Sequence, residues 1–185
     1  MMIVVTGGSG SGKSAYAEKQ ILQFGEMPRY YIATMENRDA ESQKRVDRHR
    51  AMRADKKFVT VECPYDLQEI QLEKAGAVLL ECMSNLVANE LFVKDGMAHM
   101  EQTMEKIVKG IQRLKAQCRH LVVVTNEVFS DGLQYDEWTG EYIRCLGMVN
   151  QHLSELADQV VEVVYGIPVY HKKNASEEAG RMCVG

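Results

Sequence analysis

Short apolar runs alternate with helix-length segments along the whole chain. The runs are too short for helices, and most are bounded by glycine or polar residues, which predicts buried strands. They cover residues 2–6, 30–33, 58–62, 77–81, 121–125, 159–165 and 167–171. Only Gly166 separates the last two runs, which predicts a β-hairpin near the C-terminus.

The segments between these runs have helix-compatible composition. We expect helices at 14–24, 39–53 and 65–74, after Glu81 to about Val93, and at 139–157. A further apolar stripe recurs at spacings of three and four and predicts one face of a long helix. Its members are Met97, Met100, Met104, Ile107, Val108, Ile111, Leu114 and Cys118.

The alternation of apolar strands and helices predicts an α/β fold, with a mostly parallel sheet covered by helices on both faces and a C-terminal β-hairpin. Ligands of such sheets bind beyond the carboxyl ends of the strands. The length of 185 residues favours one domain. We expect that domain to span residues 1–172, and residues 173–185 to form a flexible tail.

A phosphate-binding motif follows the first predicted strand. The motif GxxxxGK[ST] is matched without exception by Gly7, Gly8, Ser9, Gly10, Ser11, Gly12, Lys13 and Ser14. Glycines let the backbone N–H groups turn toward phosphate oxygens, the lysine adds a positive charge, and the serine hydroxyl can bind Mg²⁺. The motif lies between a strand and a helix, as a phosphate loop requires, and therefore predicts a P-loop NTPase domain that binds nucleotide.

A magnesium–nucleotide site also needs an acidic residue at the end of a nearby strand. Glu81 ends one apolar run and is the first candidate beside Ser14. Glu127 follows another run and is the second candidate. The sequence leaves the choice between them open.

Charge and cysteine usage narrow the class of protein. The net charge of −4 argues against nonspecific nucleic-acid binding. Residues 44–57 nevertheless carry seven basic and two acidic residues, which favours a small polyanion such as a nucleotide as the partner. Five cysteines without CxxC spacing argue against a zinc site or disulfide framework. With no apolar run long enough to span a membrane, we expect a cytoplasmic protein.

One histidine lies within this basic segment. Arg45, His49 and Arg53 are spaced so that a helix would place them on one face. Nearby positive charge favours the neutral imidazole, which is the nucleophilic form. From the residues alone, a surface histidine on a solvated helix is the favoured interpretation.

Six segments in order resemble one enzyme family over about residues 1–172. They are MMIVVTGGSGSGKSAYAE, YIAT, RVDRHRAMR, VLLECMSNLVANELF, VTNEV and GMVNQHLSELADQVVEVVYGIPV. Together they resemble the bifunctional adenosylcobinamide kinase/adenosylcobinamide-phosphate guanylyltransferase family, whose fold is a RecA-like P-loop NTPase.

The resemblance implies two reactions in cobalamin biosynthesis, with ATP and GTP as substrates and Mg²⁺ as cofactor. A kinase step phosphorylates adenosylcobinamide, and GMP then passes from GTP through a histidine to give adenosylcobinamide-GDP. It implies that His49 is the nucleophile and that Lys13 is catalytic. It also implies that the protein forms a homo-oligomer, namely a homotrimer. It also implies nucleotide contacts by Ala33, Thr34, Met35, Arg45, Arg50, Ala51, Met52, Arg53, Glu62 and Glu81.

Two other functions fit the same motif. A plain P-loop small-molecule kinase would use the loop without covalent histidine chemistry. A GTP-sensing regulatory module would bind nucleotide without turnover. Transfer of label from α-labelled GTP to the protein separates the plain kinase from the bifunctional enzyme, whereas the regulatory module predicts binding without turnover in the presence of any corrinoid.

Overall fold

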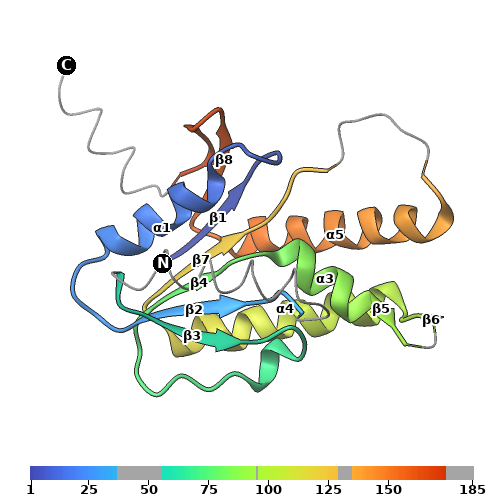
Figure 1. Cartoon of the computed structure of the whole chain (residues 1–185), viewed down its shortest axis with the longest axis horizontal. Coiled ribbons are helices and arrows are strands. Elements are labelled where there is room, and N and C mark those ends of the chain that lie inside the picture. The colour runs from blue at the N-terminus through green and yellow to red at the C-terminus, as the bar shows by residue number, and fades with distance from the viewer. Residues whose placement is uncertain (37–55, 95, 129–134, 174–185) are drawn as a thin grey trace.

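The computed structural model describes residues 1–36, 56–94, 96–128 and 135–173. Seven strands form its central sheet (Figure 1). They are β1 (Met2–Thr6), β2 (Arg29–Ala33), β3 (Phe58–Glu62), β4 (Ala77–Leu80), β7 (His120–Val124), β8 (Gln159–Val164) and β9 (Ile167–Lys172). The strand order is β3-β2-β4-β7-β1-β8-β9, and every pair is parallel except β8–β9.

Helices cover both faces of this sheet. The described helical segments are α1 (Lys13–Gln23), the single 3₁₀ turn η2 (Leu67–Glu69), α3 (Met83–Leu91), α4 (Met100–Gln117) and α5 (Glu137–Leu156). Of these, α1 packs alone on one face, whereas η2, α3, α4 and α5 share the other. A two-stranded ribbon of β5 (Phe92–Val93) and β6 (Gly96–Met97) extends from the end of α3.

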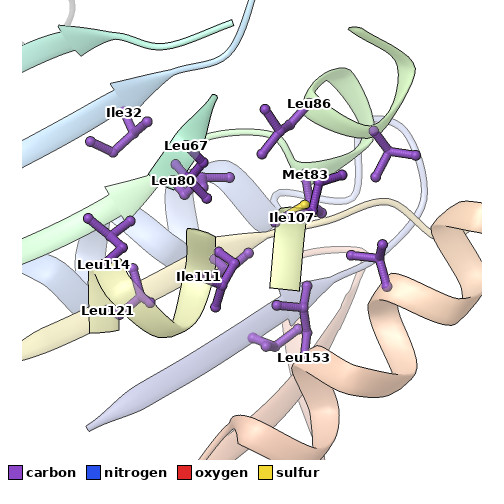
Figure 2. Packing of buried hydrophobic residues seen from close by; sticks show 14 of the residues in the cluster. Ile32, Leu67, Leu80, Met83, Leu86, Ile107, Ile111, Leu114, Leu121 and Leu153 are labelled. Atoms are coloured by element: carbon purple, nitrogen blue, oxygen red, sulfur yellow. The ribbon is translucent and has the colours of Figure 1, made fainter. Parts of the chain in front are cut away.

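Strand β1 shows why the predicted strands are apolar along their whole length. Successive side chains of a strand point to opposite faces. Met2 and Val4 join the larger core cluster, while Ile3 and Val5 join the smaller cluster under α1. Figure 2 shows part of the larger cluster, in which Ile107, Ile111 and Leu114 of α4 pack with apolar side chains of the sheet. The side chains of β1 must therefore be apolar on both faces of the sheet.

The predicted fold class and C-terminal hairpin are confirmed, and the predicted strands match β1, β2, β3, β4, β7, β8 and β9 to within two residues. The helices at 14–24 and 139–157 correspond to α1 and α5. The helix expected at 39–53 and the tail beyond residue 173 lie outside the described residues.

The helix predicted at 65–74 is wrong. Only η2 forms there, and it follows Asp66, whose φ of 55° is left-handed. Beyond it the backbone is held by a side chain of α4, because Gln117 accepts from the Leu72 N–H and donates to the Ile70 carbonyl, each at 3.0 Å. These tertiary hydrogen bonds replace the helical ones.

The apolar stripe and the helix after Glu81 are shorter than predicted. Met97 belongs to β6 and Cys118 follows the last turn, so α4 contains only the middle of the stripe. Helix α3 ends at Leu91, because Phe92 and Val93 pair with β6. The side chains of Met97 and Cys118 still pack against the core, which explains why they fit the stripe.

The described cysteines are free thiols: Cys63, Cys82, Cys118 and Cys145. Among the described residues, no helix is long and apolar enough to cross a membrane.

Two glycines give opposite predictions for stability. A Cβ on Gly76 would lie 2.2 Å from the Pro28 carbonyl oxygen, just before β4 begins. A Cβ on Gly140 of α5 would meet nothing within 4 Å. Gly76→Ala should lower the free energy of unfolding by about 1–3 kcal/mol because the backbone must shift. Gly140→Ala should raise it by about 0.5–1 kcal/mol through helix propensity.

Urea unfolding followed by circular dichroism checks both substitutions. A Gly76→Ala protein as stable as the Gly140→Ala protein would contradict the packing at the start of β4.

Candidate nucleotide site

The phosphate loop joins β1 to α1 in a conformation that needs glycine. Gly10 and Gly12 have φ angles of 71° and 92°, which are left-handed. A Cβ on Gly7 would lie 2.5 Å from the Val163 carbonyl oxygen of β8. Gly12 also forms the N-cap of α1, and its carbonyl accepts from the Tyr16 N–H at 3.0 Å. The loop therefore ends at a helix N-terminus, where unpaired N–H groups favour an anion.

Lys13 lies across this loop. Its Nζ donates to the Gly8 carbonyl at 3.0 Å. Burial is the main cause that lowers the pKa of Lys13. Burial raises the pKa of the Cys82 thiol, so that thiol is neutral beside the lysine. A bound phosphate would favour the charged ammonium, since opposite charge stabilises the ionised form.

A cavity of about 620 Å³ opens beside the loop. This volume is in the range of small-molecule sites. Its walls come from the loop, from α1, and from the carboxyl ends of β2, β4 and β7. The lining residues are Gly10, Ser11, Gly12, Lys13, Ser14, Ala15, Glu18, Tyr31, Met35, Lys56, Leu79, Glu81, Cys82, Asn85, Val124 and Asn126.

Glu81 is held toward this cavity by two donors. Its carboxylate accepts from the Tyr31 hydroxyl and, at 3.2 Å, from the Thr34 N–H. Glu81 and Ser14 both line the cavity, although β7 separates β4 from β1 in the sheet. Glu127 is not a lining residue, and its N–H donates to the Gly7 carbonyl at 3.2 Å.

The oxygens of Ser14 and Glu81 fit Mg²⁺, which prefers hard oxygen ligands. Within the described residues, no group of three or more His, Cys, Asp or Glu side chains could hold a metal ion. Mg²⁺ in nucleotide sites typically uses one or two protein ligands together with phosphate oxygens and waters. Ser14 and Glu81 therefore match an Mg²⁺ ion that binds together with the nucleotide.

The end of β2 is tied to α3. Thr34 is fully buried, and its hydroxyl donates to the Cys82 carbonyl at 2.8 Å. The Asn89 side chain donates to the Thr34 carbonyl at 2.9 Å. Ala33 is buried and Met35 lines the cavity. These bonds hold the β2–α3 wall of the site in place.

Other predicted residues are not brought to the cavity or are not described. Glu62 ends β3 opposite Ala33 and does not line the cavity. Within the loop, Gly7, Gly8 and Ser9 are likewise not lining residues. The predicted residues that lie outside the described part of the chain are Arg45, His49, Arg50, Ala51, Met52 and Arg53.

The described residues on both sides of that segment reach the site. Met35 precedes residues 37–55 and Lys56 follows them, and both line the cavity. Lys56 also forms an ion pair with Glu18 of α1. The chain that carries His49 therefore leaves and rejoins the described structure at the cavity wall.

Sequence reasoning missed several lining residues. Tyr31 lies inside an apolar run and is indistinguishable there from a core residue. Lys56 is one of seven basic residues in its segment, and nothing in the pattern separates it from the others. Asn126 follows the end of β7, and a polar residue at a strand end was the signal that could have identified it. Asn85 lies in the first turn of α3, within a family-like segment, and has no such signal.

Comparison with known proteins identifies the family of this chain. A family model described as cobinamide kinase / cobinamide phosphate guanyltransferase (CobU) matches residues 3–170. The chain belongs to this family. The predicted resemblance is thereby confirmed over nearly the whole sequence.

Curated relatives are similar to the chain over nearly its whole length. The chain is 37% identical over 182 residues to the "Bifunctional adenosylcobalamin biosynthesis protein CobU" of Salmonella typhimurium, covering 91% of this chain and 98% of that protein. It is 36% identical to the protein of the same name from Escherichia coli, with the same coverage. Among solved structures, a KaiC-like protein from Pyrococcus horikoshii matches with a TM-score of 0.48 and 14% identity, covering 87% of this chain and 71% of that chain.

The geometry around Glu81 predicts a metal-dependent defect. Glu81→Gln keeps the size of the side chain and one acceptor oxygen, but it removes the charge that attracts Mg²⁺. Turnover should fall more than nucleotide affinity, and the Mg²⁺ concentration for half-maximal rate should rise about tenfold or more. Metal titration of the kinase rate tests this, with Glu127→Gln as the matched variant. An unchanged titration for Glu81→Gln and a shifted one for Glu127→Gln would assign the role to Glu127.

Proposed function

We propose that this chain phosphorylates adenosylcobinamide and then transfers GMP from GTP to adenosylcobinamide phosphate through a GMP adduct of His49, giving adenosylcobinamide-GDP. Family membership supports the two reactions. The observation that carries the single-site mechanism is the cavity, which is lined by residues 10–14 of the phosphate loop and by both described flanks of the His49 segment. Homo-oligomer formation and a cytoplasmic location stay predictions.

The kinase step needs a triphosphate held by its β- and γ-phosphates. The corrinoid hydroxyl oxygen attacks the γ-phosphorus, the bond from that phosphorus to the bridging oxygen breaks, and ADP leaves, while the hydroxyl proton is released to solvent. Lys13 and the loop N–H groups offset the negative charge on the transferring group. Mg²⁺, when bound, neutralises phosphate charge, and Ser14 and Glu81 are the residues that would hold it.

The guanylyl step uses the same loop for a different phosphorus atom. The neutral imidazole of His49 attacks the α-phosphorus of GTP, and pyrophosphate leaves. A phosphate oxygen of adenosylcobinamide phosphate then attacks the same phosphorus, and the P–N bond to the histidine breaks. The loop and Lys13 stabilise the departing pyrophosphate just as they hold the phosphates in the kinase step.

Lys13→Ala should therefore impair both reactions. Removing the ammonium leaves the phosphate charge at the loop unmatched, and a loss of about 10²-fold or more in each kcat/KM is expected. Separate assays of phosphoryl transfer from ATP and of GMP transfer measure it. Lys109→Ala, on an exposed part of α4, is the control and should retain both activities. Near-normal GMP transfer by Lys13→Ala would reveal a second nucleotide site.

His49→Ala should abolish covalent labelling by α-labelled GTP. The expected adduct is a phosphoramidate, so the label on the unaltered protein should be lost in acid and persist in base. The kinase step should survive in part, because γ-phosphoryl transfer needs no histidine nucleophile. Arg45→Ala and Arg53→Ala should slow labelling without abolishing it, since arginines would orient the triphosphate.

His152→Ala is the matched control, because that histidine lies half-exposed on α5, where it pairs with Glu155 of the same helix. It should label normally. Full labelling of His49→Ala, or an acid-stable label, would place the nucleophile elsewhere. No labelling of the unaltered protein together with normal kinase turnover would favour the plain kinase.

A further inference from the structure

The turn between β8 and β9 presents an aromatic ring to solvent. Val164 pairs with Ile167, so Tyr165 and Gly166 form a two-residue hairpin loop. Tyr165 is 94% exposed, more than any other large hydrophobic side chain in the described part of the chain. Folding therefore gains almost nothing from burying this ring.

The backbone at this turn disfavours tyrosine. Tyr165 and Gly166 have φ angles of 50° and 79°, as a type I′ turn requires. Asparagine or glycine is preferred at the first position, because most side chains clash in the left-handed region. Tyr165 is therefore unfavourable in this backbone conformation, and its side chain is almost fully exposed. The two observations together point to a role other than stabilising the fold.

The same turn is fixed to the phosphate loop. The Gly166 N–H donates to the Ser11 carbonyl at 2.8 Å. A Cβ on Gly12 would lie 3.4 Å from the Gly166 Cα, and a Cβ on Gly7 would clash with the Val163 carbonyl. Glycines at both ends of the loop thus let the hairpin approach it closely. The tyrosine ring therefore starts from a backbone held at the rim of the loop.

Tyr165 lies on the flank of the loop opposite the cavity. The β-strands that contribute to the cavity wall are β7, β4 and β2, on one side of β1. The hairpin of β8 and β9 is on the other side of β1, and Tyr165 does not line the cavity. A nucleotide with its phosphates in the loop can therefore extend toward the cavity or toward Tyr165.

We propose that Tyr165 stacks on the base of the nucleotide that donates its γ-phosphoryl group in the kinase step. The nucleotide that gives its α-phosphate to His49 would instead extend into the cavity, beside Met35 and Lys56. This inference rests on the proposed function. Its chemical reason is that the two reactions must present different phosphorus atoms of a loop-bound triphosphate to their acceptors, and two base positions allow this.

The turn chemistry supplies a variant that removes the ring without harming the fold. Asparagine is favoured in the left-handed conformation, so Tyr165→Asn should fold at least as stably as the unaltered protein. Stacking of a base on an aromatic ring typically changes affinity by about tenfold or more. Calorimetric titration with a nonhydrolysable ATP analogue should show this loss for Tyr165→Asn. Tyr165→Phe and Tyr165→Trp, which keep a ring, should bind nearly as well as the unaltered protein.

Three further measurements separate a base contact from support of the loop. Inorganic tripolyphosphate has no base, and its affinity should be unchanged in Tyr165→Asn. The KM for ATP in the kinase step should rise about tenfold with little change in kcat. The rate of labelling at subsaturating GTP should be unchanged. Ile167→Thr, an exposed apolar position on the same hairpin, is the matched control and should alter none of these values.

Equal binding of the ATP analogue by Tyr165→Asn and the unaltered protein would overturn the proposal. Weaker binding of tripolyphosphate would also overturn it, because the turn would then act on the loop rather than on a base. A matching loss in GTP labelling would overturn the two base positions and show one position for both reactions. If the unaltered protein bound neither ligand, the phosphate loop itself, and with it the proposed function, would fail.

Discussion

The parallel pairing of β1 with β7 on one side and β8 on the other is the constraint on which the rest of the site depends. In this register Val5 lies beside Val124 and Thr6 beside Glu162, so three strands end at one edge of the sheet. The phosphate loop leaves β1 at that edge and is bonded on both flanks. Glu127 donates to the carbonyl of Gly7, and Gly166 donates to that of Ser11. The conformation of the loop is therefore set by its neighbours as well as by its glycines.

The cavity depends on a second group of bonds, between β2 and the start of α3. Thr34 donates to the Cys82 carbonyl while its own N–H donates to Glu81. A buried hydroxyl without a partner would cost free energy, so these contacts favour one arrangement of the wall. The carboxylate of Glu81 is held in the cavity by the same contacts that stabilise the fold. The contacts that position the Glu81 carboxylate for chemistry are therefore also contacts that hold this wall of the cavity together.

The strands, the fold class and the phosphate loop could be predicted because each depends on local pattern. An apolar run of five residues between polar or glycine residues is too short for a helix and must be buried as a strand. The errors arose where long-range hydrogen bonds decide the local structure. Residues 65–74 look helical in composition, yet Gln117 of α4 binds their backbone instead. Met97 fits a helical stripe because its side chain is packed against the core, although its backbone pairs with Phe92.

The sequence by itself determined the alternating α/β pattern, the phosphate loop and the family, because glycine spacing and apolar runs are local properties of the chain. Only the tertiary structure decided which side chains share the cavity. Tyr31, Lys56 and Asn126 are far apart in the sequence and carry no common motif, yet the tertiary fold brings them to one cavity. The strand order also places Tyr165 on the flank of the phosphate loop that is opposite the cavity. Strand order depends on the packing of both sheet faces together, and no single segment contains that information.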